Sequence, residues 1–176
     1  MYGEMSLIEM EDILAKYEIG EYVLYGLNGA CQVVDIGPVD FGGPDIIYYH
    51  LKPVSDMKST IFVSMKREAD IIRRVISADE AKSVLDRVKS VDKAIYTPQR
   101  EACDIILKSG DDVAISQMIK LLRFMRKENR KIHKSLNIQE EKILKDAERV
   151  FFSEMATALS MSMEEIVKTV GDTLDI

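Results

Sequence analysis

The stretch of the chain best suited to binding a charged partner runs from Lys120 to Lys134, with seven Lys and Arg residues and one acid, Glu128. At about 100° per residue, part of this set falls on one side of a helix. These residues are Lys120, Arg123, Lys127, Lys131 and Lys134. Such a stripe can follow a nucleic-acid phosphate backbone. It can equally be an ordinary solvated helix face, and the stripe alone leaves both interpretations open.

A second candidate is Tyr96, which directly precedes the sequence Thr97-Pro98, with Arg100 close behind it. An aromatic residue at the start of a helix can wedge against an unstacked base step. It can also be a partly buried side chain that covers the end of the helix. Both interpretations of Tyr96 stay open.

Enzyme chemistry finds little support in the residue pattern. The motifs GxGxxG, GxxxxGK[ST], GxSxG and HExxH do not occur. The acid pairs Asp111-Asp112 and Glu164-Glu165 stand at expected helix starts, where they complement the helix dipole. The cysteines and histidines lack the paired spacing of a zinc site; they are Cys31, Cys103, His50 and His133. We expect no catalytic residue, no cofactor and no metal.

The bulk composition is that of an ordinary globular protein, with 47% apolar and 31% charged residues. No apolar run approaches the roughly 18–20 residues of a membrane span. The first 20 residues are acidic and lack the basic and apolar regions of a signal peptide. The sequence therefore predicts a cytoplasmic location and no membrane partner.

Charge is distributed unevenly along the chain, whose net charge is -6. Residues 1–77 carry 7 Lys and Arg against 12 Asp and Glu, whereas residues 78–176 carry 17 against 18. The total argues against a protein that coats nucleic acid non-specifically. The second part nevertheless has room for a local basic face.

The elements that would position these residues change in type near Ser77. Before it, Tyr, Val, Ile, Gly and Pro predict strands and turns, after a short helix within residues 6–16. Asn28-Gly29 and Gly42-Gly43 supply tight reversals between the strands. So few short strands predict a small antiparallel barrel, closed or strongly curved. The predicted strands are 22–25, 30–37, 45–52 and 59–64.

After Ser77 the sequence predicts five helices. Ser77 with Glu80 forms a capping box that opens the first helix, which runs to about Val91. Thr97-Pro98 is expected to open the second, which ends at Ser109-Gly110. The third begins at Asp111-Asp112 and reaches about Lys134, and the others cover 138–159 and 162–174. Ser162 with Glu165 is expected to cap the last of them. The last two have the rhythm of a helix-turn-helix, but the final helix is acidic, so it is a poor reader of DNA.

The order and spacing of several motifs resemble the CarD/CdnL/TRCF family of RNA polymerase-binding transcription regulators. The resemblance covers about residues 17–175. Its motifs are Tyr17 to Tyr25 with Asn28-Gly29-Ala30, Tyr48 to Lys52, Ile72 to Ser77, Leu107 to Asp111 with Ala114 to Gln117, and Leu136 to Leu174.

The resemblance implies an α+β chain of three segments: an N-terminal extension at 1–16, a Tudor-like barrel at 17–76 and an all-α domain at 77–176. It implies that the barrel binds the RNA polymerase β subunit through an exposed strand edge. It also implies a bacterial regulator whose helical domain stabilises the open promoter complex through weak contacts to upstream DNA that are not sequence-specific. No small-molecule substrate is implied.

The chain departs from the family pattern at several positions. It has no tryptophan, and the family's wedge position corresponds to Tyr96. The basic pair that usually follows corresponds to Pro98 and Gln99, which leaves Arg100 as the nearest cation. Tyr96 and Arg100 are therefore candidate DNA-binding residues beside the basic stripe. Two arginines that some members use against polymerase correspond to positions near Val39 and Phe62. An alternative function is therefore a protein-interaction module without DNA contact.

Overall fold

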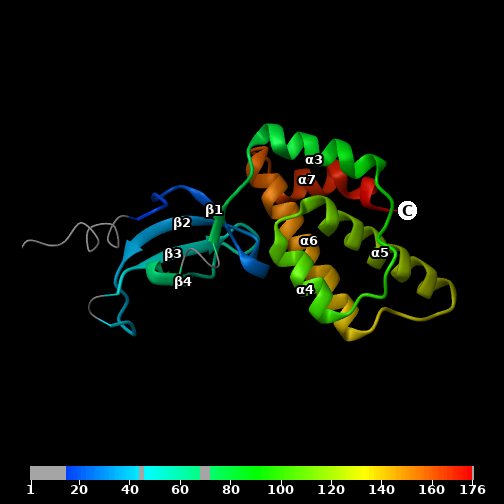
Figure 1. The fold of residues 1–176 in the computed structure, drawn as a ribbon, viewed down its shortest axis with the longest axis horizontal. Coiled ribbons are helices and arrows are strands. Elements are labelled where there is room, and N and C mark those ends of the chain that lie inside the picture. The colour runs from blue at the N-terminus through cyan, green and yellow to red at the C-terminus, as the bar shows by residue number, and fades with distance from the viewer. Residues whose placement is uncertain (1–14, 44–45, 68–71, 176) are drawn as a thin grey trace, which may run out of the picture.

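The computed structural model describes residues 15–43, 46–67 and 72–175 of the 176-residue chain. An antiparallel five-stranded sheet precedes a group of helices, so the expected α+β class is confirmed (Figure 1). The short helix expected within residues 6–16 falls almost wholly outside the described residues.

The strands follow one another along the chain as β1 (Tyr22–Tyr25), β2 (Ala30–Gly37), β3 (Tyr48–Pro53), β4 (Ile61–Ser64) and β5 (Ile72–Arg74). Their order in the sheet is β4-β3-β2-β1-β5, and every neighbouring pair is antiparallel. The first two strands match the prediction residue for residue. A register irregularity between Val33 and Asp35 interrupts the β2–β3 ladder.

The remaining strands differ from the prediction. β3 begins at Tyr48 instead of residue 45, and β4 begins at Ile61 instead of Ser59. β5 was not predicted as a strand because its three residues are too few to show an alternating pattern. It forms through its ladder with β1, in which Val23 lies opposite Arg74.

Alternation of side chains gives the sheet its core. In β3, Tyr49 and Leu51 are buried while Tyr48 and His50 face outward. The Tyr49 hydroxyl accepts a hydrogen bond from the Lys16 backbone N–H at 2.8 Å, which ties the chain before β1 to the sheet. The core of the sheet consists of Tyr17, Val23, Cys31, Val33, Tyr49, Leu51, Val63 and Ile72.

The five helices of the described chain are α3 (Ala78–Ser90), α4 (Arg100–Ser109), α5 (Asp112–Lys131), α6 (Ile138–Ala158) and α7 (Met163–Val170). The capping boxes at Ser77 and Ser162 are confirmed, and a third at Asn137 opens α6. A 3-10 turn at Gly171–Leu174 follows α7.

Two helix boundaries correct the prediction. Thr97 does not cap α4, which starts at Arg100 after Gln99, a residue that makes no side-chain cap bond. α5 ends at Lys131 and not at Lys134, because His133 adopts a positive φ of 56° and the Lys134 N–H turns back to the Asn129 carbonyl. Lys134 therefore lies outside the helix that was expected to carry it.

The turn between β1 and β2 packs directly on α6, and we call this contact the seam. The Ser153 hydroxyl lies 2.9 Å from the Ala30 backbone N–H and accepts its hydrogen bond. Beside it, the Arg149 guanidinium donates to the Leu27 carbonyl at 3.1 Å. Leu24 and Ala30 belong to the apolar core of the helices, so the sheet and helices share packing here.

An ion pair with a buried carboxylate closes the other side of the seam. Arg73 of β5 forms two bonds with the Glu154 carboxylate of α6, at 2.6 and 2.7 Å. Glu154 is fully buried and also accepts the Ile76 backbone N–H. Burial lowers the pKa of Arg73, but the hydrogen bonds and the charge of Glu154 outweigh that effect and raise it. Arg73 therefore stays charged.

No helix in the described part of the chain has the length and apolar content of a membrane span.

Candidate nucleic-acid interface

The two sides of α5 have opposite chemistry. Ile115, Met118, Ile119 and Leu122 are buried in the helical core. The second half of the helix carries cations spaced at i, i+3, i+4, i+7 and i+8, which places them on one face. These residues are Arg123, Arg126, Lys127, Arg130 and Lys131.

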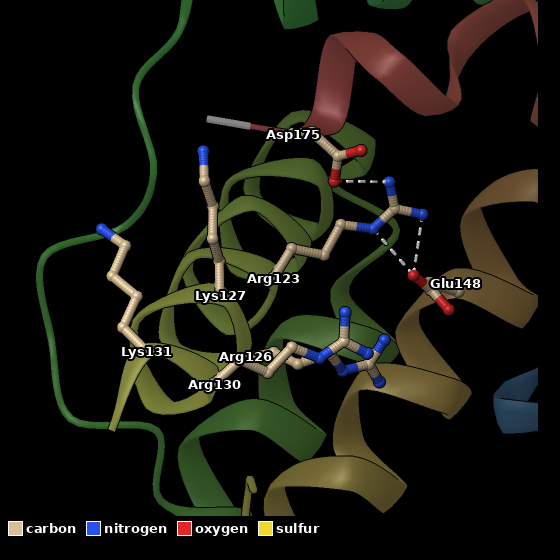
Figure 2. A pocket seen from close by; sticks show the side chains of 7 residues that line it. All are labelled: Arg123, Arg126, Lys127, Arg130, Lys131, Glu148 and Asp175. Atoms are coloured by element: carbon tan, nitrogen blue, oxygen red, sulfur yellow. Dashed lines mark hydrogen bonds and ion pairs between the residues drawn. The ribbon is translucent and has the colours of Figure 1, made fainter. Parts of the chain in front are cut away.

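This basic face lines a surface hollow of about 570 Å³, which we call the α5 hollow (Figure 2). Glu148 of α6 and Asp175 complete the lining, so five cations meet two acids. The three arginines reach toward α6, while Lys127 and Lys131 extend toward the other side of the helix. The hollow therefore has a net positive charge although the chain as a whole is acidic.

Arg123 is the best anchored cation of the hollow. Its guanidinium donates to Glu148 at 2.9 Å, to the Gly171 carbonyl at 2.9 Å and to Asp175 at 3.1 Å. It also lies 5.9 Å from the centre of the Phe152 ring. With these contacts and a side chain only 17% exposed, Arg123 holds α5, α6 and the C-terminal turn together. Glu148 and Asp175 therefore neutralise much of the positive charge of Arg123 within the protein.

Two further cations of the hollow pair with neighbouring acids. Arg126 contacts Glu141 of α6 at 2.6 Å, and Lys131 contacts Glu128 on its own helix at 2.6 Å. Both pairs are partly exposed, so water and salt screen them and each is worth little stability. A phosphate could therefore replace these carboxylates at small cost.

Lys120 corrects the predicted stripe, because it is buried and not part of the exposed face. Its ammonium donates to the carbonyls of Val88 and Val91, at 2.8 and 2.7 Å. Burial lowers the pKa of Lys120, and the charge of Asp92 opposes that shift. The C-terminal end of α3 covers α5 at this position, so Lys120 satisfies helix-end carbonyls and is not available to DNA.

Tyr96 and Arg100 do not line the α5 hollow. Tyr96 is 36% exposed, and burial, with the nearby Cys103, raises the pKa of its hydroxyl to about 12. Arg100 lies 3.8 Å from Asp104, one turn along α4. The structure thus separates these two residues from Arg123, Lys127 and Lys131, which it brings together.

Sequence reasoning missed three residues of this region. Arg126 and Arg130 complete the basic face, and the i, i+3, i+4 spacing could have identified them. Ile95 is 95% exposed beside Tyr96. The extended segment that carries it is held to α5 by a hydrogen bond from the Ala94 N–H to the Gln117 carbonyl. No sequence pattern distinguishes Ile95 from a buried isoleucine.

The sheet offers a second type of surface at β4. Within the described residues, β4 pairs only with β3, so its other side is an edge of the sheet. Unpaired backbone groups at such an edge can accept an additional strand.

Two family models match the chain. Residues 17–76 match the CarD-like/TRCF RID domain, which covers the sheet and its preceding segment. Residues 83–171 match the CarD C-terminal domain, which covers most of the helices. A search of curated proteins finds no match.

Proposed function

The chain belongs to the CarD-like family, and from this membership we propose that it binds the RNA polymerase β subunit with residues 17–76. CarD-like domains are those of non-enzymatic, RNA polymerase-interacting transcription regulators. In our proposal the helical part, residues 77–176, lies near upstream promoter DNA and stabilises the open complex in the bacterial cytoplasm.

The free edge at β4 supports polymerase binding. A strand added there would gain backbone hydrogen bonds with little demand on side-chain identity. This mode suits a chain that has non-basic residues near Val39 and Phe62, where some relatives have arginines.

The observation that carries the DNA half of the proposal is the basic face of α5, held in fixed relation to the sheet by the seam. Arg73 and Glu154 connect β5 to α6 at 2.6 Å, and α6 packs along α5. Attachment of the sheet to polymerase would therefore also orient the α5 hollow. Without such coupling, a few partly neutralised cations would bind DNA too weakly to matter.

The chemistry of the face fits phosphates and not bases. Arg and Lys side chains on an exposed helix contact backbone oxygens, which carry no sequence information directly. Apolar residues can also wedge at a base step, and Ile95, at 95% exposed, is more available for this than Tyr96, at 36%. The proposed DNA contact is therefore weak and independent of sequence.

A charge reversal tests the DNA contact. We expect Lys127→Glu with Lys131→Glu to shorten the lifetime of the polymerase–promoter open complex at least fivefold, while polymerase binding without DNA is unchanged. The matched control is Lys82→Glu with Lys89→Glu, two exposed lysines of α3 that also pair with nearby acids. A lifetime equally affected by both pairs of substitutions would contradict the proposal.

The second candidate is a protein-interaction module that lacks DNA contact. The carboxylates that pair with Arg123, Arg126 and Lys131 favour it, because they neutralise part of the basic face. Salt dependence separates the candidates, since each phosphate contact adds about 0.9 to the slope of log affinity against log salt. If the chain contributes nothing to the salt dependence of the promoter complex, the second candidate is correct.

A further inference from the structure

Four ring side chains form a continuous outward surface beside the β4 edge, and we call this surface the aromatic ledge. Phe41 stands at its centre, with its ring 5.4 Å from that of Phe62 and 6.3 Å from that of Tyr48. His50 extends it on the far side of Phe62, at 4.8 Å between ring centres. All three contacts are edge-on, the arrangement that aromatic pairs prefer.

The strands and a loop hold this ledge in place. His50 and Phe62 are direct cross-strand partners of β3 and β4, on the sheet face opposite the buried Tyr49 and Val63. Phe41 comes from the loop after β2. There Gly42 lies so close to the Tyr48 ring that an added Cβ would approach it to 2.8 Å. The loop thus packs tightly on Tyr48 and brings Phe41 over Phe62.

Exposure of the rings of the ledge to water is unfavourable in free energy. Phe41 is 74% exposed and Phe62 is 37% exposed. Exposed apolar clusters of this kind mark binding surfaces more often than scattered single residues do. Because the rings already contact one another, a partner could bury them without ordering flexible side chains.

The surroundings of the ledge define the partner that fits it. Phe62 belongs to the edge strand itself, so a strand added to β4 would place alternate side chains beside Phe62 on the same face. Asp35 lies 3.6 Å from His50 with its side chain 62% exposed, and Asp40 directly precedes Phe41. The fitting segment is therefore extended, has an apolar side chain facing the rings, and carries a nearby cation.

We propose that the aromatic ledge is an apolar docking surface for an extended, basic-flanked segment of the RNA polymerase β subunit. This inference rests on the proposed function and adds the chemistry of its contact. Burial of Phe41 and Phe62 supplies most of the affinity, in place of the arginine contacts that the resemblance implies for some relatives. Polymerase binding through the ledge therefore depends only weakly on ionic strength.

Binding of the full chain to purified RNA polymerase without DNA tests the ledge. We expect Phe41→Ser and Phe62→Ser each to weaken binding at least tenfold. The controls are Ile105→Ser and Ile138→Ser, which remove isoleucines that are 71% and 91% exposed on the helices and should leave binding unchanged. Because Phe41 is itself largely exposed, Phe41→Ser should retain the wild-type thermal midpoint.

The outcomes separate this inference from the proposed function. If the wild-type chain does not bind polymerase, the proposed function fails and the partner assigned to the ledge fails with it. If the chain binds but Phe41→Ser and Phe62→Ser bind equally well, only the ledge is contradicted. Binding lost between 0.1 and 0.5 M salt (a roughly twofold change in screening length) would show that ionic contacts, and not burial of the rings, supply most of the affinity, and would contradict the inference. Self-association abolished by Phe41→Ser would identify a second copy as the occupant and also overturn it.

Discussion

Lysines along α5 have different roles because different elements cover the helix along its length. Lys120 is 5% exposed and bonds to the end of α3, whereas Lys131, three turns later, is largely exposed and pairs with Glu128. The two side chains lie at similar angles around the helix axis. Only the position of α3 makes one structural and leaves the other available.

Substitution of Lys120 by methionine should destabilise the protein. Methionine fills a similar volume but leaves the Val88 and Val91 carbonyls without their donor. We expect a loss of about 2–3 kcal/mol in the free energy of unfolding, measured by urea denaturation. Lys131→Met is the control and should change stability by less than about 0.5 kcal/mol. Equal effects of the two substitutions would show that Lys120 is not a buried donor.

At the scale of elements, the start of α5 meets the end of β5 and the C-terminal part of α6 at a cluster of charges. Asp112 is 4% exposed, and its neighbours are Glu154, Arg73 and Asp111. Burial and the charge of Glu154, opposed by that of Arg73, together raise the pKa of Asp112 to about 7. The Asp112 carboxyl is therefore protonated in the folded protein in mildly acidic solution.

This raised pKa predicts a pH-dependent stability. Between about pH 4 and pH 7 the folded chain holds a proton on Asp112 that the unfolded chain has released, so stability falls as pH rises through this range. Asp112→Asn keeps the uncharged form at every pH. We expect it to be more stable than wild type at pH 8, by on the order of 2 kcal/mol, and less different at pH 5. Thermal midpoints measured at both pH values check this; a larger gain at pH 5 would contradict it.

At the scale of the whole molecule, the contacts of the seam hold the sheet in a fixed position against the helices. Gly29 is central to it, because its φ of 73° and its closeness to α6 both exclude a side chain. A Cβ there would collide with the Ser153 hydroxyl and approach the Arg149 carbonyl to 3.1 Å. The relation between the sheet and the α5 hollow thus depends on one close approach.

We expect Gly29→Ala to weaken the seam. The control, Gly26→Ala, also has a positive φ (47°) but has no atom within 4 Å of the added Cβ. Gly26→Ala should cost about 1–2 kcal/mol from backbone strain alone, and Gly29→Ala at least about 1 kcal/mol more. Urea denaturation measures both. In the open-complex assay, Gly29→Ala should retain polymerase binding and lose the effect on lifetime; equal stability of the two variants would contradict the role of the close approach.

Local signals predicted much of the fold. Residues 22–25 and 30–37 and the caps at Ser77 and Ser162 were predicted correctly, because turns and capping boxes depend on residues within one or two turns of each other. β5 and the start of α4 were not predicted correctly. A strand of three residues forms only when it pairs with a neighbouring strand, and Thr97-Pro98 predicted a helix start earlier than the observed one at Arg100. The basic character of α5 was predicted, but the predicted set of exposed cations left out Arg126 and Arg130 and included the buried Lys120.

The sequence by itself determined the family, the α+β class and the basic second half of α5, since motif order, residue periodicity and side-chain charge are written in the chain. The tertiary structure decided which of those cations face solvent, because Lys120 is covered by a helix end some 30 residues earlier in the chain. It also decided that Phe41, Tyr48, His50 and Phe62 form one surface, because a loop and two strands bring them together only after the sheet has formed. Burial and long-range contact depend on what packs from elsewhere, and no local pattern encodes them.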